Sequence, residues 1–167
     1  NSLATDVGVS STTIKEWLSL LETSYIITIL HPYYRNFGKR FIKAPKVYFI
    51  ETGLAAYLLG IRSDKQVATH PLVGNLFENM VVVDILKQRL NQGLTPDMYY
   101  MRTSNGVEID VVQENEGTLD LYEIKSGATF NKEMAKNLLA LRSTIGDEIG
   151  HQTVIYAGHA ASLVEGI

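Results

Sequence analysis

The chain has 167 residues, of which 46% are hydrophobic and 20% charged, and this balance predicts a packed globular core rather than disorder. It contains no cysteine, which excludes disulfides and thiolate metal sites, and no apolar run approaches the roughly 18 residues of a membrane span. The start of the chain lacks an initiator Met and the basic-then-apolar pattern of a signal peptide. We therefore expect a fragment of a longer cytoplasmic protein with no membrane partner.

The net charge of −3 is unevenly distributed along the chain. Residues 1–66 carry eight Lys/Arg against five Asp/Glu, whereas residues 67–167 carry seven against thirteen. Between Arg35 and Lys46 there are five basic residues and no acidic one. A local basic patch favours polyanion binding more directly than whole-chain charge does, so DNA is the partner we expect for this part.

Residues 3–22 have the pattern of a helix-turn-helix. Ala4 is small enough for two helices to approach, Gly8 supplies the turn, and Ser10 or Ser11 can cap the second helix. The apolar positions of that helix would face the core: Ile14, Trp17 and Leu21. Its polar positions would face a DNA groove: Ser11, Thr12, Thr13 and Lys15.

Two β-branched runs follow, over residues 25–30 and 46–50, and we expect them to pair as the strands of a wing. The basic loop between them would contact phosphates through Arg35, Lys39, Arg40 and Lys43. Residues 51–60 predict a short helix, and residues 61–71 are polar and finish with His70-Pro71, so we place the domain boundary in that segment. We therefore predict a winged-helix domain over residues 1–66, which could equally serve as a protein-contact or spacer module.

The remaining residues, 67–167, predict a second domain of α+β or α/β class. A helix over residues 72–90 is apolar around nearly its whole circumference, so we expect it to be largely buried. Strands are expected at 97–102, 107–114 and 119–125, joined by turns into an antiparallel meander. A helix over residues 131–145 would then carry the chain across to a last strand at 153–157.

Strand periodicity sorts the charges of this second domain. Glu123 and Lys125 are two residues apart and should project side by side. On the preceding strand, Asp110 should share a face with Glu108 and Val112. A carboxylate among apolar neighbours is unfavourable unless it is paired, hydrogen-bonded or bound to a metal. The two strands therefore predict a functional or ion-paired cluster.

Glu78, on the first helix of this domain, would reach the same point if that helix packs on the face of Asp110. Hard divalent cations prefer carboxylate oxygens, so we expect Asp110 and Glu123 to bind Mg²⁺ or Mn²⁺. The Ile124 carbonyl is a plausible third ligand, and Glu78 could bind a second ion directly or through water. Lys125 would orient or deprotonate the attacking water. The alternative is a structural cluster of salt bridges.

The order of Glu on a helix, Asp on the second strand and Glu-x-Lys on the third resembles the PD-(D/E)XK nuclease superfamily. The resemblance implies a restriction-endonuclease-like core of helix, three strands, helix and strand, generally with Mg²⁺-dependent activity. The Pro-Asp with which the superfamily motif opens is replaced by Ile109-Asp110 in this chain.

More narrowly, the whole chain resembles the uncharacterised C-terminal region of a family of bacterial and archaeal AAA-type ATPases. Six segments carry this resemblance: residues 3–21, 46–54, 74–79, 99–103, 108–110 and 123–126. It implies that the missing ATPase domain is a partner. No Gly-x4-Gly-Lys-Ser/Thr motif occurs in the chain, so ATP would enter only through that domain.

These observations leave three hypotheses about function. The first is a metal-dependent nuclease-like domain tethered to a winged helix. The second is a catalytically silent module that retains the fold to grip nucleic acid or protein and to regulate the ATPase. The third is a transcriptional regulator, which would require sequence-selective contacts by residues 11–15. The net charge of −6 over residues 67–167 repels DNA, so metal ions or the basic wing would have to compensate.

Overall fold

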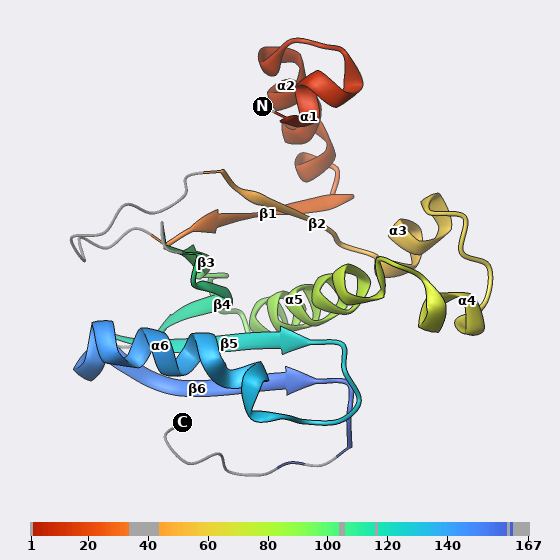
Figure 1. The fold of residues 1–167 in the computed structure, drawn as a ribbon. Helices are drawn as coiled ribbons and strands as arrows, with labels where there is room; N and C mark the ends of the chain where they lie inside the picture. The colour runs from red at the N-terminus through yellow and green to blue at the C-terminus, as the bar shows by residue number, and fades with distance from the viewer. Residues whose placement is uncertain (1, 34–43, 104–105, 116, 160, 162–167) are drawn as a thin grey trace.

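The computed structural model describes residues 2–33, 44–103, 106–115, 117–159 and 161. It is a mixed α/β protein with one six-stranded sheet, in the strand order β2-β1-β3-β4-β5-β6 (Figure 1). No helix in the described ranges is both long and apolar enough to span a bilayer.

The chain begins with a pair of short helices, α1 (Ser2–Val7) and α2 (Ser11–Thr23). Of the two predicted caps, Ser10 is the one used, because its hydroxyl accepts a hydrogen bond from the Thr13 N–H at 3.0 Å. Ala4 is buried as expected. The prediction that Trp17 faces a core is wrong, since its side chain is 48% exposed. The helix α2 packs mainly against β1 and α1, and none of its residues is buried.

The hairpin of β1 (Ile27–Pro32) and β2 (Lys46–Phe49) is antiparallel, as predicted. Its connecting loop carries the four predicted phosphate contacts, Arg35, Lys39, Arg40 and Lys43, all of which lie outside the described residues. The hairpin also joins the main sheet, because β1 runs parallel to β3 (Met98–Arg102) through the pairs His31↔Tyr99 and Pro32↔Tyr100. The sheet is therefore continuous between the two predicted domains.

Three helices connect the hairpin to the rest of the sheet: α3 (Thr52–Leu58), α4 (Asp64–Thr69) and α5 (Val73–Asn91). The helix α4 was not predicted and lies within the polar segment 61–71. Ser63 caps α4 by accepting from the Gln66 N–H, a local signal typical of a helix start. The domain boundary predicted between residues 66 and 67 falls inside this helix.

The strands β3, β4 (Glu108–Asn115) and β5 (Thr118–Lys125) form the predicted antiparallel meander. A short 3-10 turn and α6 (Lys136–Ile145) then carry the chain to β6 (Ile149–Tyr156), which runs parallel to β5. The last strand begins at residue 149 rather than at 153, because it pairs with β5 from Leu119 onward.

The two long helices pack on opposite faces of the sheet. The α5 face encloses one apolar cluster, which includes Val82, Val111 and Ile124. The α6 face encloses a second, which includes Ile109, Val112, Leu121 and Leu138. Along β5 the alternation is regular, with Leu121 in the α6 cluster and Tyr122 and Ile124 in or against the α5 cluster.

The alternation on β4 is broken by a β-bulge. Tyr99 pairs with Val112 and Met101 with Ile109, so two residues of β4, Asp110 and Val111, lie opposite one residue of β3. Because of the extra residue, Ile109 and Val112 both pack toward α6. The prediction that Asp110 shares a face with Val112 is therefore wrong, since strict period-two counting fails across a bulge.

Candidate functional site

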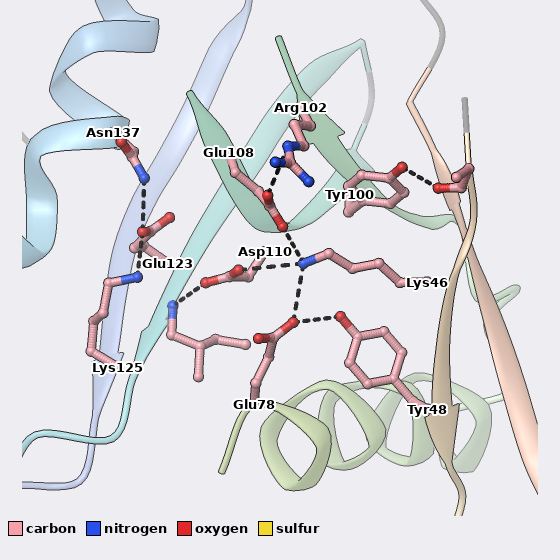
Figure 2. Close-up of polar contacts among 12 residues, drawn as sticks. Lys46, Tyr48, Glu78, Tyr100, Arg102, Glu108, Asp110, Glu123, Lys125 and Asn137 are labelled. Atoms are coloured by element: carbon pink, nitrogen blue, oxygen red, sulfur yellow. Dashed lines mark hydrogen bonds and ion pairs between the residues drawn. The ribbon is translucent and has the colours of Figure 1, made fainter. Parts of the chain in front are cut away.

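The site lies where β4 and β5 separate. Their regular pairing ends at Val111↔Tyr122, one residue before Asp110 on β4 and Glu123 on β5. The Ile124 N–H instead donates to the Asp110 carboxylate, with 2.8 Å between Ile124 N and Asp110 Oδ2 (Figure 2). A side chain thus takes the place that a backbone carbonyl would have in a continued ladder, and it fixes one oxygen of Asp110 between the strands.

Lys46, the first residue of β2, connects three carboxylates on the α5 side of Asp110. Its Nζ lies 3.1 Å from Glu78 Oε1, 2.6 Å from Glu108 Oε1 and 3.6 Å from Asp110 Oδ1. The Tyr48 hydroxyl donates to the same Glu78 oxygen at 2.7 Å. Figure 2 shows Lys46 and Tyr48 reaching the acids from one strand, with Glu78 rising from α5 below them. We call Lys46, Glu78, Glu108 and Asp110 the lysine cluster.

Further contacts hold the lysine cluster in place. Arg102 Nε lies 3.3 Å from the second Glu108 oxygen, and Lys46 Nζ lies 5.3 Å from the centroid of the Tyr100 ring. The Tyr100 hydroxyl in turn donates to the Ala44 carbonyl, two residues before Lys46. The cluster therefore has three acids against one internal lysine, with Arg102 at its rim.

Glu123 occupies a different environment, on the α6 side of the sheet. Its Oε1 accepts from Lys125 Nζ at 2.6 Å and from Asn137 Nδ2, on α6, at 3.1 Å. The side chain is 2% exposed, and its Oε2 is buried with no hydrogen-bond partner among the described residues. The predicted side-by-side placement of Glu123 and Lys125 is confirmed.

The electrostatics tie the two environments together through Asp110. Burial, and then the charge of Asp110, raises the pKa of Glu123 to about 6. Burial, and then the charge of Glu78, raises the pKa of Asp110, against the opposing effect of the Ile124 N–H. For Lys46, burial acts downward, but the charges of the surrounding acids outweigh it and raise its pKa. In both Asp110 and Glu123 the surroundings therefore disfavour the charged form, an effect that a nearby cation opposes.

The predicted site residues consequently fall into two neighbouring groups. Glu78 and Asp110 contact Lys46, whereas Glu123 and Lys125 contact each other. Ile124, which was expected to offer its carbonyl to a metal, meets Asp110 through its N–H. Within the described ranges no three His, Asp or Glu side chains converge as a metal-binding group. The acids lie on the elements predicted for them, but Glu78 and Asp110 contact Lys46 on the α5 side of the sheet, apart from Glu123.

The predicted groove-facing residues lie far along the chain from the acids, on the helical pair at the other end of the molecule (Figure 1). Ser11, Thr12 and Lys15 are exposed. Thr13 is half-buried, and its hydroxyl is hydrogen-bonded to Ser10 at 2.9 Å. Their contact with DNA stays a prediction.

Sequence reasoning missed four residues of the site: Lys46, Tyr48, Glu108 and Asn137. Two of them carried a usable signal, since Lys46 and Tyr48 are two apart on a predicted strand and so share a face. Glu108 was placed beside Asp110 but given no role. Asn137 gave no signal, because nothing in the sequence indicates which turn of α6 meets β5.

The donor set suits a hard divalent cation, because it consists of carboxylate oxygens and includes the partnerless Glu123 Oε2. Asp110 and Glu123 are the residues that would hold such an ion. In this structure the Lys46 ammonium is the positive charge in contact with Glu78, Glu108 and Asp110.

The fold makes the chain a mixed α/β protein whose acid-rich site lies on one six-stranded sheet. Residues 73–166 match a domain of unknown function, DUF4143, and residues 1–65 match a second domain of unknown function, DUF8612. The chain belongs to the DUF4143 family. All the acids of the site lie in the first match, and Lys46 and Tyr48 lie in the second.

Two relatives extend the comparison: uncharacterized protein Rv2008c of Mycobacterium tuberculosis and uncharacterized protein Mb2031c of Mycobacterium bovis. Each is 30% identical to this chain over 159 residues, which is 93% of the chain. The chain spans 34% of the length of these relatives. No solved structure gives a significant match.

Proposed function

We propose that this chain is a metal-dependent phosphodiesterase domain of the PD-(D/E)XK nuclease type, acting on nucleic acid. The observation that supports it most is the separation of β4 and β5 at Asp110. At this separation the charge of Asp110 acts on Glu123, whose buried Oε2 has no partner in the described structure, and the Lys125 ammonium acts on Asp110. A purely structural ion pair would not need a buried carboxylate oxygen left without a hydrogen bond.

Each residue has a role that its environment favours. Asp110 and Glu123 would hold Mg²⁺ or Mn²⁺, and the bound ion would supply charge stabilisation and an acidified water. Lys125 is 39% exposed and already within 2.6 Å of Glu123, so it can orient that water or neutralise charge on the phosphoryl oxygens. Glu78 projects from α5 toward Asp110 and can complete the shell.

The same proposal covers the parts of the protein to which this domain would be joined. The first helical pair and the hairpin would act as a winged helix that positions nucleic acid, and the chain would be the C-terminal part of an AAA-type ATPase. The support for this setting is the resemblance of six segments to that region, together with relatives whose length is about three times that of the chain.

Cleavage assays on the purified chain test the proposal. Supercoiled plasmid, linear duplex, branched DNA, single-stranded DNA and RNA are each incubated with Mg²⁺, with Mn²⁺ and with EDTA. We expect metal-dependent cleavage of at least one of them, and its loss in Glu123→Gln and in Asp110→Asn. The matched control is Glu133→Gln, the same exchange at a carboxylate that is 84% exposed.

Lys46 supports a second candidate, a catalytically silent module that binds nucleic acid or protein and regulates the ATPase. The Lys46 ammonium contacts all three acids on that side and so compensates part of their charge without an ion. This candidate predicts binding that survives EDTA and shows no turnover on any substrate. Cleavage that persists at the wild-type rate in Glu123→Gln would reject the catalytic assignment.

A further inference from the structure

Lys46 belongs to a different part of the chain from the acids that it contacts. It lies on β2, in the segment that matches DUF8612, whereas Glu78, Glu108 and Asp110 all lie in the segment that matches DUF4143. Its ammonium is therefore supplied to the candidate site by the neighbouring hairpin.

The position of that ammonium conflicts with a second cation at the same acids. Lys46 Nζ is 3.6 Å from Asp110 Oδ1, while the Ile124 N–H occupies Asp110 Oδ2. Glu78 Oε1 likewise receives both Lys46 and the Tyr48 hydroxyl. Two positive charges a few ångströms apart repel strongly in a partly buried site. Both contacts of Glu78 are made at Oε1, and Glu123 is the acid of the predicted set whose spare oxygen is buried.

The hairpin that carries Lys46 pairs with the rest of the sheet over a short stretch, although its Leu30 and Tyr48 side chains are buried in the cluster on the α5 face. Between β1 and β3 there are two paired positions, compared with five for β4 and β5. The other strand of the hairpin is held by Asn79 of α5. The Phe49 N–H donates to Asn79 Oδ1 at 2.8 Å, and Asn79 Nδ2 donates to the Phe49 carbonyl at 2.9 Å. A small shift of the hairpin, or rotation about the flexible lysine stem alone, would withdraw the ammonium without breaking the main sheet.

We propose that Lys46 is a displaceable internal cation that competes with the divalent metal ion for Asp110 and Glu78. The inference rests on the proposed function and adds its regulation: the metal ion and Lys46 exclude one another at the acids. By linkage, whatever draws the hairpin away from Asp110 raises metal affinity, and metal binding in turn loosens the hairpin.

Mn²⁺ binding to the whole chain, measured by calorimetry and by the loss of the free-ion electron paramagnetic resonance signal, tests the inference. We expect Lys46→Met to bind Mn²⁺ about tenfold more tightly than the wild type, because one repelling charge is removed. The matched control is Lys87→Met, which removes the same charge from an exposed pair with Glu51 and should leave the affinity unchanged. Added Mn²⁺ should also raise the melting temperature of Lys46→Met more than that of the wild type.

Equal or weaker Mn²⁺ binding by folded Lys46→Met would overturn the inference and make Lys46 a residue that positions the acids. An equal gain in Lys87→Met would overturn it too, because the effect would then come from net charge. If Lys46→Met does not fold, Lys46→Met with Glu108→Gln removes one charge of each sign and is read in the same way.

Failure of the proposed function gives a different pattern. Tight Mn²⁺ binding by Lys46→Met, lost on adding Glu123→Gln, with no cleavage of any nucleic acid would leave the competition standing and reject catalysis. Absence of Mn²⁺ binding in both the wild type and Lys46→Met would overturn the competition and the metal site together.

Discussion

On the α5 side of Asp110, three acids surround Lys46, and Glu78 also accepts a hydrogen bond from Tyr48. On the α6 side, Glu123 is almost completely buried, yet one of its oxygens has no hydrogen-bond partner in the described part of the chain. The two sides meet at one carboxylate and are built from neighbouring strands of the same sheet. The difference is that the three acids of one side share Lys46, whereas the single acid of the other side is paired with Lys125 but keeps one buried oxygen without a hydrogen bond and has a pKa raised to about 6.

This contrast indicates which side contributes to stability and which side is available for chemistry. A satisfied ion cluster tolerates burial because each charge has a partner. A buried carboxylate with a spare oxygen destabilises the fold at neutral pH, and such groups concentrate at functional sites. Three substitutions test this contrast between the two sides of Asp110.

Replacing Lys46 by Met should give the largest loss of stability. Three partly buried carboxylates would be left without their common partner, and breaking such a cluster from one side lowers the free energy of unfolding by roughly 3 kcal/mol. Chemical denaturation in EDTA measures this value. A change below about 0.5 kcal/mol, the size typical of an exposed pair, would show that the lysine cluster is not an integrated unit.

Replacing Glu123 by Gln should stabilise the protein, with a pH dependence opposite to that of an ordinary ion-paired acid. The folded-state pKa of about 6 lies above the unfolded value near 4.5, so the contribution of Glu123 to stability is most favourable below pH 4.5. That stability is lost as pH rises through 6. Glu123→Gln should therefore gain roughly 2 kcal/mol over the wild type at pH 8, and little at pH 4.

Unfolding curves of the wild type and Glu123→Gln at several pH values provide this measurement. A constant difference between pH 4 and pH 8 would mean that Glu123 has an ordinary pKa and that the two sides of Asp110 do not differ. Glu133→Gln again serves as the exposed control, for which we expect no pH-dependent difference.

Replacing Tyr48 by Phe should have the smallest effect of the three. The change removes one hydrogen bond to Glu78 while Lys46 remains, so we expect a loss of about 1 kcal/mol in the free energy of unfolding. Tyr25→Phe is a suitable control, because Tyr25 is 82% exposed. A loss as large as that of Lys46→Met would show that the hydroxyl, and not the ammonium, holds Glu78 in place.

The sequence predicted the order of the main elements because their signals are local. A long segment that is apolar around nearly the whole helix marked α5, and β-branched runs separated by turns marked the meander. Glu123 and Lys125 were paired correctly, since β5 is regular between them. The strand that carries Asp110 was predictable, but the face on which its side chain lies was not. The extra residue of the bulge depends on the pairing of β4 with β3, and the sequence of β4 alone does not indicate it.

The role of Lys46 could not be predicted for a different reason. It depends on the hairpin joining the sheet through two parallel pairs and on contacts between residues 32 to 64 positions apart. Trp17 shows the opposite error, since helical spacing marked it as a core residue. Periodicity gives a face of a helix but does not show whether anything covers that face.

Diffraction from a crystal of the chain soaked in Mn²⁺ tests the central claim most directly. The account predicts an anomalous peak between the Asp110 and Glu123 carboxylates, with Glu123 Oε2 as a ligand and the Lys46 ammonium moved away from Asp110. A fully soaked crystal with no peak there, in which Lys46 still bridges Glu78 and Asp110, would contradict it.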